Sequence, residues 1–179
     1  LAELERLGLK GTHSDDKFIP ECYKYASREQ RLQLLNGFLD TDGSIDKNGV
    51  IEYTTISEQL ANDFQWLAWS LGYRCSKNKG KSFLNGVRYK DRYRMVLSGN
   101  GNNEKLFTDE NRNTLYLEKK RSKFPTIMSV EYIGEEECQC ISVSHPRKLF
   151  VTDDFIVTHN TQFAVKFAKA AAQSGKKVL

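Results

Sequence analysis

The tripeptide His159-Asn160-Thr161 brings together three side chains that could act on the peptide backbone. An Asn side-chain amide can attack its own carbonyl carbon, close a succinimide and break the peptide bond that follows. A neighbouring imidazole can polarise that carbonyl or donate a proton, and an activated Thr hydroxyl can accept an acyl group. The same tripeptide could also be a plain helix cap, because Asn and Thr both favour helix starts.

A second candidate group is the acidic pair in "LLNGFLDTDGSI", where Asp40 and Asp42 end a predicted helix. Two carboxylates at a helix C-terminus oppose the macrodipole, and a bound cation would relieve this conflict. Mg²⁺ suits such a place, since it binds one or two carboxylates together with phosphate oxygens and waters. Asp-Thr-Asp-Gly is also a typical turn sequence. For Asp40 both interpretations stay open, whereas for Asp42 we favour a functional role because a basic hairpin follows.

The positive charge is concentrated in residues 74–94, which contain eight Lys and Arg residues against one Asp, although the whole chain has a net charge of +4. Asn85-Gly86 predicts a tight hairpin turn within this segment, because both turn positions require positive φ. That turn would set three pairs of cations opposite each other, and the period of two puts them on one face. The predicted pairs are Lys81 with Lys90, Lys79 with Arg92, and Lys77 with Arg94, and Arg88 joins them.

Like charges opposite each other destabilise a β-ladder, so aligned cations favour a face that lies against a polyanion. A two-stranded ribbon fits the major groove of B-DNA, and each phosphate that it neutralises releases counterions. The alternative is a solvated edge hairpin whose Lys residues block edge pairing. The predicted DNA-binding residues are Lys77, Lys79, Lys81, Arg88, Lys90, Arg92 and Arg94.

Two helices and several strands must position these groups. Ser27 with Gln30 three residues later forms a capping box signature, and an apolar stripe follows in Leu34, Leu35, Phe38 and Leu39. The segment "VIEYTTIS" predicts a strand. The segment "SEQLANDFQWLAWSLGY" predicts a second helix with a stripe of Leu60, Phe64, Leu67 and Leu71. The pattern indicates an α+β fold.

The segment "LLNGFLDTDGSI" resembles the LAGLIDADG motif of homing endonucleases, and the resemblance continues through Lys123. It implies an αββαββ-like half of such an endonuclease with a basic β-ribbon face for double-stranded DNA. By the same resemblance, Asp42 would hold the divalent metal, Mg²⁺, at the scissile phosphates, and Asp40 would support the packing of two such helices. The family also uses a basic residue near the metals, which by position is Lys119 or Lys120. Because one motif is present and the family uses two, we expect the first repeat in a missing N-terminal portion.

The segment "CISVSHPRKLFVTDDFIVTHNT" resembles the C-terminal splicing blocks of inteins. The resemblance implies that Asn160 cyclises, that His159 assists it, and that Thr161 is the nucleophile that receives the upstream extein. Cys140 stands where the family places a residue that coordinates the steps. Splicing would need no cofactor. The strand-like stretches 138–143, 149–151 and 155–157 would form the C-terminal β segment of a Hint-type splicing domain.

One position departs from the intein pattern. Lys148 stands where the family often has a His, and His145 lies three residues earlier, where it would face differently. His145-Pro146-Arg147 could be a plain turn.

The residues after Asn160 have a separate character. "TQFAVKFAKAAAQSGKKVL" predicts an amphipathic helix from Phe163 that leads to a strand, and Thr161 fits the end of a P-loop, GxxxxGK[ST]. Splicing would then rebuild a nucleotide site in a host that is an ATP-binding, DNA-processing protein.

The expected organisation is therefore a linker in 1–26, a second endonuclease repeat in 27–125, a splicing segment in 126–160 and a C-extein from 161 to 179. The cysteines, including the pair Cys138 and Cys140, lack zinc-site spacing and are typical of a reducing cytoplasm. No apolar run is long enough for a membrane span. The alternative is a freestanding LAGLIDADG endonuclease or DNA-binding protein without splicing.

Overall fold

The computed structural model describes residues 1–84, 86–98 and 104–117, and, further on, 129, 131–132, 134–135, 137, 141–153 and 155–158. The chain divides into two compact units, Leu1–Lys123 and Phe124–Leu179. Within the described residues, no helix is long and apolar enough to cross a membrane.

Helix α3 (Arg28–Thr41) begins with the predicted capping box. The Ser27 hydroxyl accepts a hydrogen bond from the Gln30 backbone N–H at 3.3 Å, and the Gln30 side-chain oxygen accepts one from the Ser27 N–H at 3.2 Å. These bonds satisfy two backbone donors that a helix start leaves without partners. The predicted stripe points inward, because Leu35 and Leu39 are fully buried and Leu34 and Phe38 pack against the core.

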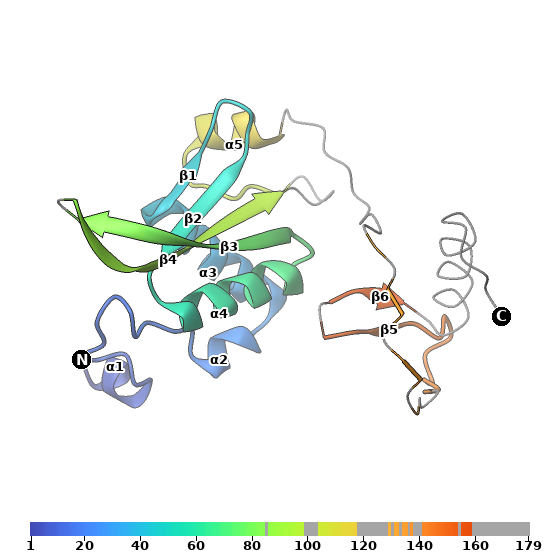
Figure 1. The fold of residues 1–179 in the computed structure, drawn as a ribbon. Helices are drawn as coiled ribbons and strands as arrows, with labels where there is room; N and C mark the ends of the chain where they lie inside the picture. Colours follow the sequence, from blue (N-terminus) through green and yellow to red (C-terminus); the bar gives the residue numbers. More distant parts are fainter. Residues whose placement is uncertain are drawn as a thin grey trace. The chain divides into compact units, whose positions relative to one another are not determined.

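A four-stranded antiparallel sheet follows α3, in the order β1-β2-β4-β3 (Figure 1). Its strands are β1 (Gly43–Ile45), β2 (Ile51–Thr55), β3 (Arg74–Leu84) and β4 (Val87–Ser98), with helix α4 (Glu58–Ser70) between β2 and β3. Helix α5 (Glu110–Leu117) comes after β4, and two short helices, α1 (Ala2–Arg6) and α2 (Glu21–Lys24), precede α3. The predicted α+β class and the αββαββ order are confirmed.

Helices α3 and α4 cover one face of this sheet and form the core with it. The predicted stripe of α4 is buried in full, and so are Tyr53, Met95 and Leu97 from the strands. The rings of Phe38, Tyr53 and Phe64 join α3, β2 and α4, with centroids 4.5 to 5.8 Å apart. Burying each side chain of this size contributes roughly 1.5–3 kcal/mol, so this joint fixes α3 against the sheet.

A buried carboxylate fastens the N-terminal segment to α4. Asp63, which is 3% exposed, accepts hydrogen bonds from the Ile19 N–H at 2.9 Å, from Lys24 Nζ at 3.0 Å and from Gln59 Nε2 at 3.0 Å. The Ser57 hydroxyl donates to the Lys17 carbonyl at 2.6 Å. A buried charge needs such partners, and the result is that residues 17–24 are held at the start of α4.

The described part of the second unit contains one small antiparallel pair, β5 (Phe150–Val151) with β6 (Val157–Thr158), in which Phe150 pairs with Thr158. The predicted strand at 155–157 is wrong at its start. Phe155 has φ 57° and closes a turn by donating its N–H to the Thr152 carbonyl at 2.9 Å.

Two further sequence predictions concern this unit. Ile141 to Val143 form no strand, so the predicted strand 138–143 is wrong over these residues, and 138–140 lie outside the described residues. His145-Pro146-Arg147 is the turn that the sequence allowed, since the Lys148 N–H donates to the His145 carbonyl at 2.8 Å. The helix and strand predicted after Thr161 lie outside the described residues.

The two cysteines of the first unit test this fold. Cys75 on β3 is buried, and burial raises the pKa of its thiol to about 12, whereas Cys22 is exposed. Because the thiolate is the reactive form, a maleimide reagent at pH 8 should modify Cys22 and spare Cys75 until denaturant is added. Peptide mapping by mass spectrometry measures both sites in one sample, and equal labelling of the two thiols in the native chain would contradict the fold.

The same burial predicts a loss of stability at high pH. The unfolded thiol releases its proton near its ordinary pKa of 9.0 and the folded thiol near 12. The contribution is therefore complete below pH 9 and is lost as the pH rises towards 12. Cys75→Ala should remove this part of the pH dependence of the unfolding free energy.

Candidate active site at the end of helix α3

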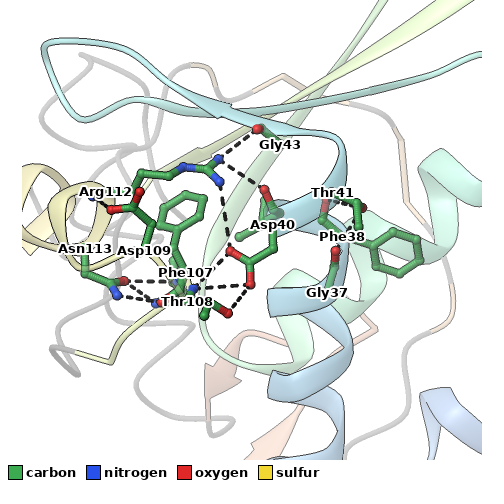
Figure 2. Close-up of polar contacts among 12 residues, drawn as sticks. Gly37, Phe38, Asp40, Thr41, Gly43, Phe107, Thr108, Asp109, Arg112 and Asn113 are labelled. Carbon is green, nitrogen blue, oxygen red and sulfur yellow. Dashed lines mark hydrogen bonds and ion pairs between the residues drawn. The ribbon is translucent and has the colours of Figure 1, made fainter.

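Asp40 is engaged inside the fold. Its carboxylate accepts two hydrogen bonds from the Thr108 backbone N–H, at 3.0 and 3.2 Å, and one from the Thr108 hydroxyl at 2.6 Å (Figure 2). Arg112 lies 3.9 Å from the same carboxylate. Asp40 therefore ties the end of α3 to the segment that leads into α5.

Arg112 caps the C-terminus of α3. Its Nη2 atom donates to the Leu39 carbonyl at 3.1 Å and to the Gly43 carbonyl at 2.8 Å, and its guanidinium lies 3.9 Å from the centre of the Phe107 ring (Figure 2). A cation here opposes the negative end of the helix dipole. The sequence suggested that a bound metal would offset the negative charge at this helix end. At Asp40, the Arg112 side chain offsets it instead.

Asn113 holds the segment that carries these partners. Its side chain accepts from the N–H groups of Leu106 and Phe107, at 2.9 and 3.0 Å, and donates to the Phe107 carbonyl at 2.6 Å. Asn113 is 1% exposed. A buried amide with all these bonds made is stabilising, while one left unpaired is costly, so Asn113 holds the backbone of Leu106 and Phe107 against the start of α5.

Gly43 follows the acidic pair and has no room for a side chain. A Cβ atom added there would lie 2.5 Å from the Leu39 carbonyl oxygen and 2.7 Å from the Leu39 Cα. The chain therefore turns from α3 into β1 by a close approach of backbone to backbone that only Gly permits.

Asp42 differs from Asp40 because its side chain is uncommitted. Its backbone N–H completes the helix by donating to the Phe38 carbonyl at 3.1 Å, and the residue is exposed. Among the described residues, no hydrogen bond or ion pair involves the Asp42 carboxylate. Asp42 lines a shallow hollow of about 430 Å³ together with Ser14, Lys17, Tyr53, Thr54, Thr55, Ile56 and Leu60.

The hollow has a mixed polar and apolar lining, in which Asp42 and Lys17 are the charged residues. Burial, and to a smaller degree the Asp42 carboxylate, raises the pKa of Tyr53 to about 12, so its hydroxyl stays neutral. Within the described part of the chain, no group of three or more His, Cys, Asp or Glu residues could hold a metal ion by itself. Asp42 fits Mg²⁺ as a single carboxylate ligand, since this ion keeps several waters and takes phosphate oxygens.

The basic hairpin forms, but its register differs from the predicted one. Leu84 pairs with Val87 as predicted, and Gly86 has φ 78°. A β-bulge between Lys81 and Phe83 then shifts the pairing by one residue. A shift of one residue moves a strand's side chains to the other face, so the prediction that all the cations lie on one face is wrong.

The cations are divided between the two faces of the ribbon. Lys77, Lys79 and Lys81 lie opposite Met95, Tyr93 and Asp91 of β4. This is the face that α3 and α4 cover nearer the centre of the sheet, where Tyr93 and Met95 are buried. Arg92 and Arg94 lie opposite Gly80 and Asn78, and they belong to the open face.

Several of these cations have acidic or polar partners, which reduces the charge left for a ligand. Lys79 and Arg88 lie 3.6 and 3.3 Å from Asp91. The other pairs are Arg94 with Glu52, Lys90 with Asp15, and Lys77 with Asn62. Exposed pairs of this kind contribute little to stability because water and salt screen them. In the described ranges, Lys81 and Arg92 have no ion-pair partner.

Cys140, His159, Asn160, Thr161, Lys119 and Lys120 lie outside the described residues. Five further residues shape the site although the sequence did not indicate them, namely Lys17, Asp63, Thr108, Arg112 and Asn113. The one local signal for the last two was Asp109, which accepts hydrogen bonds from the N–H groups of residues 111 and 112 at the start of α5.

Comparison with known proteins identifies the domain that carries this site. Residues 29–116 match the family model of the LAGLIDADG-like domain. The chain therefore contains a LAGLIDADG-like domain, the domain class of homing endonucleases. The chain is also 27% identical, over 182 aligned residues, to the replicative DNA helicase DnaB of Mycobacterium intracellulare. That alignment covers 96% of this chain and 30% of the relative's length.

Two glycines of the motif should respond in opposite ways to Ala. Gly43→Ala forces a Cβ against the Leu39 backbone and should lower the free energy of unfolding by roughly 1–3 kcal/mol. Gly37→Ala meets nothing within 4 Å and should raise it by about 0.5–1 kcal/mol, because Ala favours a helix interior. Urea unfolding of both variants measures the difference, and a neutral Gly43→Ala would contradict the close approach.

Proposed function

We propose that this chain is the C-terminal part of an intein that carries half of a LAGLIDADG homing endonuclease. The observation that carries the endonuclease part is the contrast between two neighbouring carboxylates. Asp40 is held by Thr108 and Arg112, while Asp42 stands free of such bonds in an open hollow. A metal ligand needs a carboxylate that the fold holds in place and whose oxygens make no other bonds.

In this proposal Asp42 holds Mg²⁺ at the scissile phosphate of double-stranded DNA. The bound ion would supply Lewis-acid stabilisation of the phosphate and a more acidic water for hydrolysis. Lys17 lines the same hollow and its ammonium would bind a phosphate oxygen as a point charge. Lys119 or Lys120 stays the proposed basic residue contributed from beyond α5.

A second motif helix would complete the site. One side of α3 is exposed along Gln30, Gln33, Gly37 and Thr41, and nothing lies near the position of a Gly37 Cβ. Small residues let two helix backbones approach closely. The missing first repeat would pack there and bring its own carboxylate to the metals.

The open face of the sheet is the proposed DNA surface. The helices cover the other face at Tyr93 and Met95, so DNA can lie along the central strands only on the side of Arg92 and Arg94. At the outer end of the ribbon, where residues on both faces are exposed, Lys81, Arg88 and Lys90 would reach backbone phosphates. Such contacts position a protein on DNA without reading its sequence. Lys77 and Lys79 lie opposite the buried Met95 and Tyr93 on the face that the helices cover, so they would not meet DNA on the open face.

The splicing part of the proposal is supported by the alignment with DnaB. The aligned region extends beyond residues 29–116, which supports an endonuclease domain embedded in a DnaB-like helicase. Asn160 would cyclise, assisted by His159. The bond from its carbonyl carbon to the Thr161 nitrogen would break as the succinimide forms. Thr161 would carry the acyl group of the upstream extein and then end a rebuilt P-loop of the host, and Cys140 would coordinate these steps.

The described residues reach to two positions before Asn160, where Thr158 is paired with Phe150 in β5. The rival proposal is an endonuclease or DNA-binding protein that does not splice, and it predicts an uncut bond after Asn160.

Separate substitutions should remove the two activities independently. In the complete reading frame, Asp42→Asn should abolish cutting of a plasmid that carries the host gene without the intein, while splicing continues, because splicing needs no metal. Asn160→Ala should block cleavage of the peptide bond before Thr161 and leave DNA cutting intact. Intact-mass spectrometry and plasmid linearisation measure the two outcomes. Loss of both activities in either variant would sink the two-module proposal.

The open-face arginines should carry nonspecific DNA affinity. Arg92→Gln should weaken binding to a random-sequence duplex and reduce the slope of log K against log salt by about 1, since each phosphate contact releases counterions. The control is Lys105→Gln, an exposed cation outside the ribbon that pairs with Glu110. Fluorescence anisotropy over a salt series measures both, and an unchanged slope for Arg92→Gln would refute this DNA surface.

A further inference from the structure

The end of α3 is held by one guanidinium at two points that enclose Asp42. Arg112 Nη2 bonds the carbonyl of Leu39, three residues before Asp42, and the carbonyl of Gly43, directly after it. The backbone of Asp42 therefore lies between two carbonyl groups that accept hydrogen bonds from the same nitrogen atom. Any rotation of the peptide groups around Asp42 would stretch one of these bonds.

The guanidinium itself is held on its other sides. The Phe107 ring packs against its plane at 3.9 Å, and the Asp40 carboxylate lies at 3.9 Å from Nη1. Asn113 fixes the backbone of Phe107, and the Thr108 hydroxyl and N–H fix Asp40 (Figure 2). The orientation of Arg112 is thus determined by groups from both α3 and the segment before α5.

A simple helix cap would not need this arrangement. One bond to a terminal carbonyl would serve the helix, and a Lys could supply it. The flat fork of Arg reaches two carbonyls, a carboxylate and an aromatic face at once, which the single ammonium of Lys cannot do. The extra bond to Gly43 acts on the turn after the helix, where Asp42 leaves it.

We propose that Arg112 is a positioning residue for Asp42, which fixes the direction of the metal-binding carboxylate without touching metal or DNA. This inference rests on the proposed role of Asp42 as the Mg²⁺ ligand. Residues that orient metal ligands from outside change metal affinity by about 10–100-fold when they are replaced, and a similar effect is expected here.

The experiment measures Mn²⁺ binding to the complete intein, first repeat included, by electron paramagnetic resonance, with Mn²⁺ as the probe for Mg²⁺. Arg112→Met should weaken Mn²⁺ binding about tenfold or more, and Arg112→Lys should recover only part of the loss. Lys105→Met is the matched control, since it removes a cation near α5 that pairs with Glu110, and it should leave binding unchanged. Circular dichroism establishes that each variant is folded at the temperature used.

The outcomes separate this inference from the proposed function. Asp42→Asn in the same assay tests the metal ligand itself. If Asp42→Asn reduces Mn²⁺ binding while folded Arg112→Met and Arg112→Lys bind like the parent protein, Arg112 is a structural cap and the inference is wrong. If Asp42→Asn leaves Mn²⁺ binding unchanged, the proposed role of Asp42 fails, and the inference fails with it. If Arg112→Met is unfolded, Arg112→Lys decides alone, and unaltered binding in that variant overturns the inference.

Discussion

The structure of the first unit depends on how the negative end of α3 is neutralised. The helix ends with free carbonyl groups and two carboxylates close together, which is unfavourable unless a cation is near. Arg112, seventy residues after Asp42 in the chain, supplies that charge and bonds the carbonyls on both sides of the turn. This contact couples α5 to α3, holds the close approach at Gly43 and leaves Asp42 as the carboxylate that faces solvent.

The division of labour between Asp40 and Asp42 follows from that contact. Two identical side chains, two residues apart, point in different directions at the end of a helix, because residues i and i+2 do not share a face. One finds the Thr108 donors and the guanidinium. Asp42 lines a hollow together with Lys17. The hydrogen bonds of Asp63 and Ser57 hold the segment that contains Lys17 next to α4. Packing thus separates a structural carboxylate from an available one.

The ribbon shows how a single bulge redistributes charge. Without the bulge, three pairs of cations would oppose each other on one face, and their repulsion would destabilise the ladder. With it, Lys77, Lys79 and Lys81 face Met95, Tyr93 and Asp91, and acidic partners lie near several cations. On the open face, which the helices leave uncovered, Arg94 pairs with Glu52, and Arg92 has no ion-pair partner among the described residues. The cations of the ribbon are therefore divided between its two faces, and several of them are paired with acidic residues.

The sequence by itself determined helices α3 and α4, the α+β class and the LAGLIDADG-like character, because these depend on local signals. The capping box at Ser27, the stripes of α3 and α4 and the Asn85-Gly86 turn all act within a few residues. It also singled out Asp42, whose metal role stays a prediction, as do the splicing roles of His159, Asn160 and Thr161. Only the tertiary structure decided the ribbon register, since the β-bulge between Lys81 and Phe83 has no turn or period signal of its own in the sequence. Only it revealed Arg112, because a contact between residues so far apart leaves no periodic trace in the sequence.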